Sequence, residues 1–303
     1  MITINKDTNS ISPADWEAGG QTHTHAGHSI FYRSEGAGPD LVLLHGFPTS
    51  SYDWKYLWPE LTGRFRCIAP DFIGYGFSDK PRDYDYSIHD QASIIEEILA
   101  AEGVSRAYIL THDYGVSVAQ ELLARYEDRR RSGARGTEII SVCFLNGGLF
   151  PESHRPRLIQ KLLLSPLGSV VGRLINERTF RKNFKQVFGP DTRPTETELQ
   201  EFWSLIERGD GARVYHKLIG YITDRRRHRD RWVNVLRETT VPLRIVNGPE
   251  DPVSGIHLVE RYRELVPNPD VVVLDGIGHY PLTEDPTGTL NAFLEFVEGR
   301  GRG

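Results

Sequence analysis

Short apolar runs alternate with amphipathic helical stretches through the first half of the chain, and this alternation constrains the fold more than any other feature. Repeated strand–helix units predict an α/β protein whose central sheet is mostly parallel and flanked by helices. The expected strands are residues 29–33, 41–44, 66–69, 108–111 and 139–145, and the expected helices are 51–61, 87–101 and 116–125. Functional loops should then gather at the carboxyl ends of the strands.

The pattern changes after residue 146, where strand signals vanish and helical stretches separated by Pro and Gly take over. Strand and helix alternation then resumes near the C-terminus. The later expected elements are strands at 241–246 and 271–274 and helices at 256–265 and 289–297. The sequence therefore predicts a core made of residues 1–146 and 238–303, with a helical cap, or lid, inserted at 147–237.

Composition and charge exclude several function classes. The net charge of −5 over 303 residues gives no overall attraction to nucleic acid, and the basic run at 225–231 is interpreted as a solvated helix face. No apolar run reaches the length of a membrane span, and the start of the chain lacks the pattern of a signal peptide. Two cysteines in apolar stretches, Cys67 and Cys143, are expected to be free thiols in a reducing compartment. We therefore expect a cytoplasmic protein without a metal or cofactor; its oligomeric state is not indicated.

The strongest chemical signal is the segment Thr-His-Asp-Tyr-Gly at 111–115, which lies between an expected strand and an expected helix. This context is typical of a nucleophile elbow, where a sharp turn exposes one side chain and small neighbours such as Gly115 relieve crowding. The exposed position holds Asp113. A carboxylate is already ionised at neutral pH and can attack an electrophilic carbon to form an ester. The alternative is that Asp113 only caps the helix.

A second motif, His-Gly-Phe-Pro at 45–48, follows the strand at 41–44. A loop at this place can direct the Phe47 backbone N–H toward the reaction centre. Together with the Tyr114 N–H it would form an oxyanion hole. The alternative is a simple Gly-Pro turn.

Two further motifs supply a candidate acid and a candidate base. Asp251, in Gly-Pro-Glu-Asp-Pro after one strand, would orient a catalytic imidazole, with Glu250 as the neighbouring alternative. His279, in Gly-Ile-Gly-His-Tyr after the next strand, would activate water as a general base. A turn-forming Asp and a solvated loop His are the ordinary alternatives. The order nucleophile, acid, histidine favours the catalytic interpretation.

These motifs resemble the α/β-hydrolase superfamily, in particular its epoxide hydrolase and haloalkane dehalogenase branch, which has an Asp nucleophile. Nearly the whole chain also resembles the mesoderm-specific transcript proteins, an epoxide-hydrolase-like family of animals whose own reaction is not defined. The segments that carry this likeness are residues 45–81, the His-Asp-Tyr-Gly motif, and residues 145–156 and 187–194.

The resemblance implies an epoxide hydrolase that converts a small lipophilic epoxide into a vicinal diol. Members of that branch use cap tyrosines to hydrogen-bond the epoxide oxygen as the ring opens. Tyr221 precedes Val241 by a spacing similar to the family's, and Tyr215 is the reserve candidate; no second family tyrosine is recognised in residues 176–190. The alternative for Tyr221 is a core residue. The other expected substrate-pocket residues are His45, Pro48, His112 and Tyr280.

Two alternatives to an epoxide hydrolase remain open: a haloalkane dehalogenase and a non-catalytic protein with the same scaffold. A haloalkane dehalogenase of this family usually has Trp after the nucleophile and often Asn after the His-Gly pair, where this chain has Tyr114 and Phe47. Both departures argue against a haloalkane dehalogenase. Fluoroacetate dehalogenases place Arg after the nucleophile, so Tyr114 argues against that activity too. A serine esterase is disfavoured because the elbow holds Asp113 and not Ser. A non-catalytic ligand-binding or interaction protein on a hydrolase scaffold is the alternative from another class.

Overall fold

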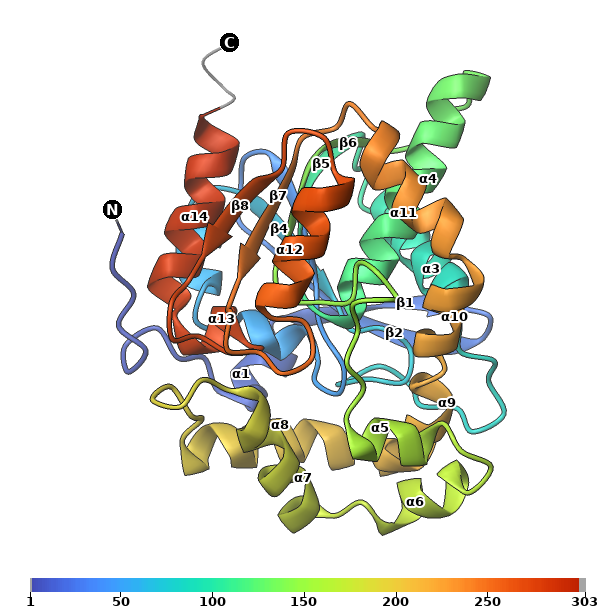
Figure 1. Cartoon of the computed structure of the whole chain (residues 1–303), viewed down its shortest axis with the longest axis vertical. Coiled ribbons are helices and arrows are strands. Elements are labelled where there is room, and N and C mark those ends of the chain that lie inside the picture. The colour runs from blue at the N-terminus through green and yellow to red at the C-terminus, as the bar shows by residue number, and fades with distance from the viewer. Residues whose placement is uncertain (1, 300–303) are drawn as a thin grey trace.

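A single eight-stranded sheet organises the chain in the computed structural model, which describes residues 2–299 (Figure 1). The strand order is β1-β2-β4-β3-β5-β6-β7-β8. The strands are β1 Gly20–His25, β2 His28–Glu35, β3 Asp40–Leu44, β4 Arg66–Pro70, β5 Arg106–Thr111, β6 Glu138–Phe144, β7 Leu243–Asn247 and β8 Asp270–Val273. β2 is antiparallel to both of its neighbours, and all other pairs are parallel. This confirms the predicted α/β class.

Helices pack around the sheet because each parallel crossover must cover an apolar face. α3 and α11 lie against α4, while α12 and α14 pack on β7. These helices, with the shorter ones of the core, are α1 Pro13–Ala18, α2 Trp58–Thr62, α3 Ile88–Ala101, α4 Tyr114–Ser132, α11 Arg229–Glu238, α12 Ile256–Leu265, α13 Pro281–Glu284 and α14 Pro286–Glu298. Cys67 and Cys143 are free and buried in strands of this core.

A helical insertion separates β6 from β7 and lies below the sheet in Figure 1. Its helices are α5 Leu158–Leu163, α6 Gly168–Leu174, α7 Glu177–Phe184, α8 Glu196–Glu207, α9 Tyr215–Leu218 and α10 Tyr221–Arg227, with 3-10 turns at Lys185–Val187 and Arg208–Val214. α9 and α10 lead back to α11, which lies beside α4 in the core layer although the expected cap range 147–237 includes most of it. The cap is the part of this insertion from α5 to α9.

One strand was not predicted, and one local expectation was wrong. The polar sequence of β1 has no apolar alternation, so nothing in it signals a strand; it exists because it pairs with β2 along an exposed sheet edge. The single helix expected at 51–61 is a 3-10 turn, Ser51–Trp54, followed by α2, which starts at Trp58 with Pro59 in its first turn. Within residues 2–299, no helix is both long and apolar enough to cross a bilayer.

Candidate active site

Asp113 occupies the sharp turn between β5 and α4, at the carboxyl edge of the sheet. Its backbone has φ 40° and ψ −99°, a conformation that a non-glycine residue rarely adopts and that is typical of a nucleophile elbow. Two glycines permit the turn. A Cβ on Gly115 would lie 2.7 Å from the Leu44 carbonyl oxygen, and one on Gly147 would lie 2.9 Å from the Asp113 carbonyl oxygen. The second glycine comes from the loop after β6 and supplements Gly115.

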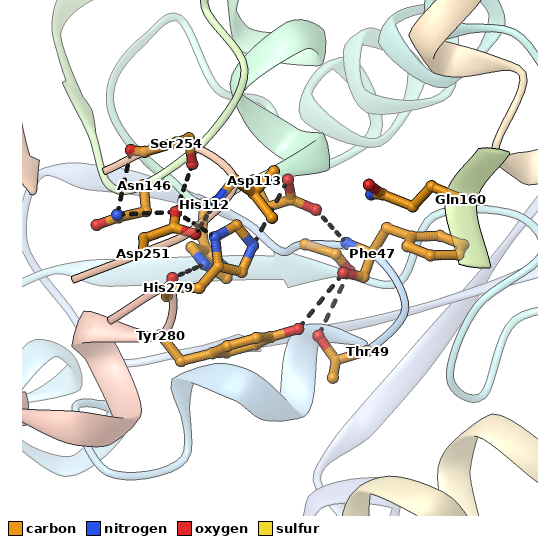
Figure 2. Close-up of polar contacts among 12 residues, drawn as sticks. Phe47, Thr49, His112, Asp113, Asn146, Gln160, Asp251, Ser254, His279 and Tyr280 are labelled. Carbon is orange, nitrogen blue, oxygen red and sulfur yellow. Dashed lines mark hydrogen bonds and ion pairs between the residues drawn. The ribbon is translucent and has the colours of Figure 1, made fainter. Parts of the chain in front are cut away.

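The two carboxylate oxygens of Asp113 have different surroundings (Figure 2). Oδ2 accepts a hydrogen bond of 3.0 Å from the Phe47 backbone N–H, as expected for the loop at 45–48. Oδ1 lies 3.7 Å from Nε2 of His279, and Asp113 lines the cavity beneath the cap. Tyr114 is the first residue of α4, where helix N–H groups have no intrahelical acceptor. One oxygen is thus held by a backbone donor, while the other accepts no hydrogen bond among those of residues 2–299.

Asp251 and His279 form a close buried pair. Nδ1 of His279 lies 2.7 Å from Oδ2 of Asp251. The same oxygen accepts hydrogen bonds from the Ser254 hydroxyl at 2.6 Å and the Asn146 side-chain amide at 3.0 Å. Burial alone would raise the pKa of Asp251, but His279, the Ser254 hydroxyl and the Val253 N–H hold it well below its ordinary value. Asp251 therefore stays ionised and fixes the orientation of the imidazole. Glu250, its neighbour, shows no bond to His279 among the hydrogen bonds of residues 2–299.

The protonation of His279 depends on both carboxylates. Burial alone would lower its pKa, but Asp251 and then Asp113 raise it to about 9. At neutral pH the resting site therefore carries an imidazolium between two carboxylates. Conversion of Asp113 into a neutral ester would remove one of these charges and lower the pKa of His279. The imidazole then becomes a base at the step that needs one.

Two other predicted pocket residues, His45 and His112, lie behind the cavity wall and support the site loops. Nε2 of His112 bonds the backbone carbonyl of His279 at 2.7 Å, and Nε2 of His45 accepts from the Phe72 N–H at 3.0 Å. Burial lowers the pKa of each to about 3, so both are neutral at physiological pH. They hold the backbone that presents Phe47 and His279.

A cavity of about 120 Å³ lies between the sheet edge and the cap, with Asp113 and His279 in its wall. Most of its lining is apolar, and the cap contributes residues of α5, α7 and the turn after α7. Examples are Leu163, Phe180, Phe184 and Val187. Pro48, Tyr215 and Tyr280, all predicted from the sequence, also line it. The cavity suits a lipophilic ligand with one reactive group at the Asp113 end.

The two candidate cap tyrosines differ in position. Tyr215 lines the cavity, and its hydroxyl donates to the Pro48 carbonyl at 3.2 Å. Tyr221 is not among the residues that line this cavity; its ring lies 5.2 Å from that of Tyr114. Burial and then the Asp113 carboxylate raise the pKa of Tyr221, while polar contacts with Gln160 and Arg225 oppose the rise. Among the hydrogen bonds of residues 2–299, none is donated by the Tyr221 hydroxyl, unlike those of Tyr215 and Tyr280.

Arg225 was not predicted as part of the site, and the expectation of a solvated face at 225–231 was wrong for this residue. Its side chain is 1% exposed. Nη2 donates to the Asp113 carbonyl at 3.0 Å, Nε donates to the Ser117 hydroxyl at 2.6 Å, and the guanidinium stacks over the Tyr221 ring at 4.5 Å. Nothing in the sequence distinguishes the buried Arg225 from its neighbours Arg226 and Arg227, which carry the same charge and are exposed.

Gln160, Asn146 and Ser254 also escaped prediction. Figure 2 shows the Gln160 amide directed toward Asp113 from α5. Its Oε1 accepts from the Arg157 N–H at 2.8 Å, so its NH₂ group is the end that can face a ligand. Asn146 bridges the loops after β6 and β7 by accepting from the Gly248 N–H at 2.7 Å. The position of Asn146 directly after an apolar strand was the one sequence feature that could have marked it as a site residue.

Comparison with known proteins agrees with this architecture. Residues 39–286 match the family model described as alpha/beta hydrolase fold. The chain is 47% identical over 300 residues to the mesoderm-specific transcript protein of Mus musculus, covering 95% of this chain and 89% of that protein.

Two solved structures are similar in fold. An epoxide hydrolase, CorEH, superposes with a TM-score of 0.74 at 20% identity, covering 92% of this chain and 98% of that one. A haloalkane dehalogenase variant from Bradyrhizobium elkanii has a TM-score of 0.73 at 22% identity, covering 92% and 96%. At such low identity these likenesses establish the fold alone.

Proposed function

Because the chain belongs to the α/β-hydrolase family, we propose that it hydrolyses lipophilic epoxides to vicinal diols through a covalent ester on Asp113. The observation that carries the proposal is the carboxylate in the nucleophile elbow. One of its oxygens is bonded to the Phe47 N–H, the other lies 3.7 Å from Nε2 of His279, and the residue lines an apolar cavity. A carboxylate in this position forms an alkyl ester with an electrophilic carbon rather than the acyl intermediate of a serine esterase.

In the first step Oδ1 of Asp113 attacks a ring carbon, and the carbon–oxygen bond of the epoxide breaks. The ring oxygen takes a proton as it leaves. We assign this proton to Tyr221, because its ring lies 6.0 Å from that of Phe47 in the cavity wall and its hydroxyl donates no hydrogen bond among residues 2–299. The proton of Tyr215 already bonds the Pro48 carbonyl. The buried guanidinium of Arg225 would stabilise the phenolate that forms.

In the second step water attacks the ester carbonyl of Asp113. His279, relieved of the Asp113 charge, accepts the proton of this water, and Asp251 stabilises the imidazolium. Negative charge develops on Oδ2, which already accepts from the Phe47 N–H, and the Tyr114 N–H at the start of α4 would be the second donor. Collapse of this intermediate breaks the alkyl ester, and the proton held by His279 passes to the leaving alcohol. The resting proton of His279, released when the ester forms, returns to the Tyr221 phenolate through water, and the acid proton left on the Asp113 carboxyl passes to His279. The diol then leaves with Asp113, His279 and Tyr221 in their resting states.

Dehalogenation by the same nucleophile has less support. It requires donors in the cavity that hold the departing halide, and the position after Asp113 is the family's usual source of one. Here that residue, Tyr114, packs against Phe72 and Tyr75 at ring distances of 5.2 and 5.4 Å, and its side chain contacts Gln91. Tyr114 does not contribute to the cavity lining found in residues 2–299.

The decisive test is to trap the ester. His279→Gln removes the base of the second step but leaves Asp113 free to react, so incubation with a panel of lipophilic epoxides and haloalkanes should give a covalent adduct. Mass spectrometry of the intact variant and of its peptide containing Asp113 would locate that adduct.

Asp113→Asn is the matched control, because it retains the shape of the elbow but lacks the nucleophilic charge. Diol release by the unmodified protein and an adduct in His279→Gln alone would support the proposal. Halide release without diol would replace it by dehalogenation. Ligands that stabilise the fold but are never turned over and never form an adduct would favour a binding protein.

A further inference from the structure

The outer face of the cap carries a cluster of exposed large apolar side chains, which we call the apolar cap patch. All of its members lie on α5, on α6 or between them, and they are 42% to 73% exposed. They are Leu158, Leu162, Leu167, Val170 and Leu174. Within residues 2–299, the other large hydrophobic side chain with comparable exposure is Ile256, on α12. Such clustering on one surface, rather than scatter, marks an interaction site.

The patch is separate from the substrate cavity, because α5 presents different residues to each side. Ile159 and Leu163, one helical turn apart, line the cavity. Leu158 and Leu162, also one turn apart, face outward. The cavity therefore does not account for the outer leucines. Figure 1 shows α6 at the edge of the molecule farthest from the sheet, with α5 between it and the core.

Charge around the patch indicates what it contacts. The segment 155–185 contains eight Lys or Arg residues and one acidic residue, Glu177, in a chain whose net charge is −5. Lys161, Arg173, Arg178 and Lys182 are exposed. None of these four cations takes part in an ion pair among the salt bridges of residues 2–299. Unpaired cations of α5, α6 and α7 thus flank the apolar patch, and the acidic side chains near it, Glu207 and Asp210, share a surface pocket with Arg173.

We propose that the apolar cap patch docks on the surface of an anionic lipid bilayer. Exposed leucines at the interface and cations at the headgroups are the two contributions that bind amphipathic surfaces to such membranes. A second copy of the chain fits less well. A symmetric dimer through the patch would place the flanking cations of the two copies against each other. Docking would also bring the cavity wall formed by α5 next to the bilayer, from which a lipophilic substrate can pass under the cap.

Vesicle binding tests the proposal without any substrate. The full chain should co-float with vesicles of phosphatidylcholine and phosphatidylglycerol and bind weakly to phosphatidylcholine alone. The triple substitution Leu158→Ser, Leu167→Ser and Leu174→Ser should abolish binding. Ile256→Ser, which removes a large exposed apolar side chain outside the patch, should leave it unchanged.

The electrostatic part has its own variants. Lys161→Gln combined with Arg173→Gln should weaken partitioning by about fivefold per lost cation. Arg106→Gln, an exposed substitution at the amino end of β5, is the matched control. Added salt should weaken binding of the unmodified protein in the same direction.

An environment-sensitive dye on Leu167→Cys reports which surface touches the lipid, since both native cysteines are buried. Its emission should shift to the blue on anionic vesicles, and the same dye on Ile256→Cys should not respond. Absence of binding, or binding that ignores both sets of patch variants, would overturn the proposal. So would a dimer in light scattering that the leucine substitutions dissociate. Asp113→Asn should bind vesicles like the unmodified protein, so this result is independent of the proposed reaction.

Discussion

Nε2 of His279 lies 3.7 Å from Oδ1 of Asp113. This distance is too short for a bridging water molecule and too long for a normal hydrogen bond. The two groups therefore interact through their charges without a direct hydrogen bond. Attack by Asp113 on a substrate would end this coupling, because an ester carries no charge. The protonation of His279 thus depends on the state of the nucleophile.

The first prediction concerns this coupling. Asp113→Asn removes one of the two carboxylates that raise the pKa of His279 to about 9, so the pKa should fall. NMR titration of the imidazole signals would measure the shift, with His112 as an internal control that stays neutral through the same range. An unchanged His279 titration would contradict the proposed link between ester formation and the base.

A second prediction concerns stability. Since the pKa of His279 is raised from 6.5 to about 9, the folded state binds its proton more tightly than the unfolded state. This contribution to the free energy of unfolding is complete below pH 6.5 and is lost as the pH rises through about 9. The loss is at most roughly 3 kcal/mol. Denaturant unfolding across this window should show the decline, and His279→Gln should lack it. A decline of equal size in the variant would assign it to other groups.

A third prediction follows the oxygen atoms. In a single turnover with enzyme in excess, carried out in water with a heavy oxygen isotope, the new diol oxygen should come from Asp113 and the label should enter Asp113. The reason is that water attacks the ester carbonyl and not the substrate carbon. Mass spectrometry of the diol and of the Asp113 peptide would measure both. Label in the first diol would mean that water opens the epoxide directly.

The fourth prediction separates the two cap tyrosines. Tyr221→Phe should lower the rate of adduct formation by roughly 10²- to 10⁴-fold, the usual contribution of a general acid. Tyr215→Phe should have a smaller effect, mainly on KM, because Tyr215 forms part of the cavity wall and its proton already bonds Pro48. Pre-steady-state alkylation rates in the His279→Gln background would measure both. The reverse ranking would transfer the acid role to Tyr215.

The fifth prediction concerns Arg225. Arg225→Met leaves the Asp113 carbonyl and the Ser117 hydroxyl without their buried donor, at a cost of about 1–3 kcal/mol in the free energy of unfolding. It should also slow alkylation, because the elbow loses a contact that positions it. Arg226→Met, an exposed neighbour, is the control and should alter neither measurement. Equal effects of the two substitutions would show that only net charge matters.

The amino-acid sequence alone was sufficient to predict the strands around the site and the chemistry at their ends. The apolar runs that became β3, β5 and β6 have few alternatives to a buried parallel sheet, so the loops after them had to share one edge. This is why the Phe47 amide, Asp113, Asp251 and His279 lie close together, as the order of their motifs indicates. Their catalytic roles remain predictions that the experiments above test.

Other features depended on contacts between distant segments, and only the tertiary structure decided them. β1 forms because β2 offers it an edge, and Arg225 is buried because α10 lies against the elbow while Arg226 faces water. Leucines on one short helix divide between cavity and surface according to what packs beside α5. Local sequence encodes which backbone geometry a segment prefers. Whether a given side chain is buried, paired or exposed depends on neighbours that are far away along the chain. For Asp113, the local sequence determined its place in the elbow, and distant segments determined its contacts.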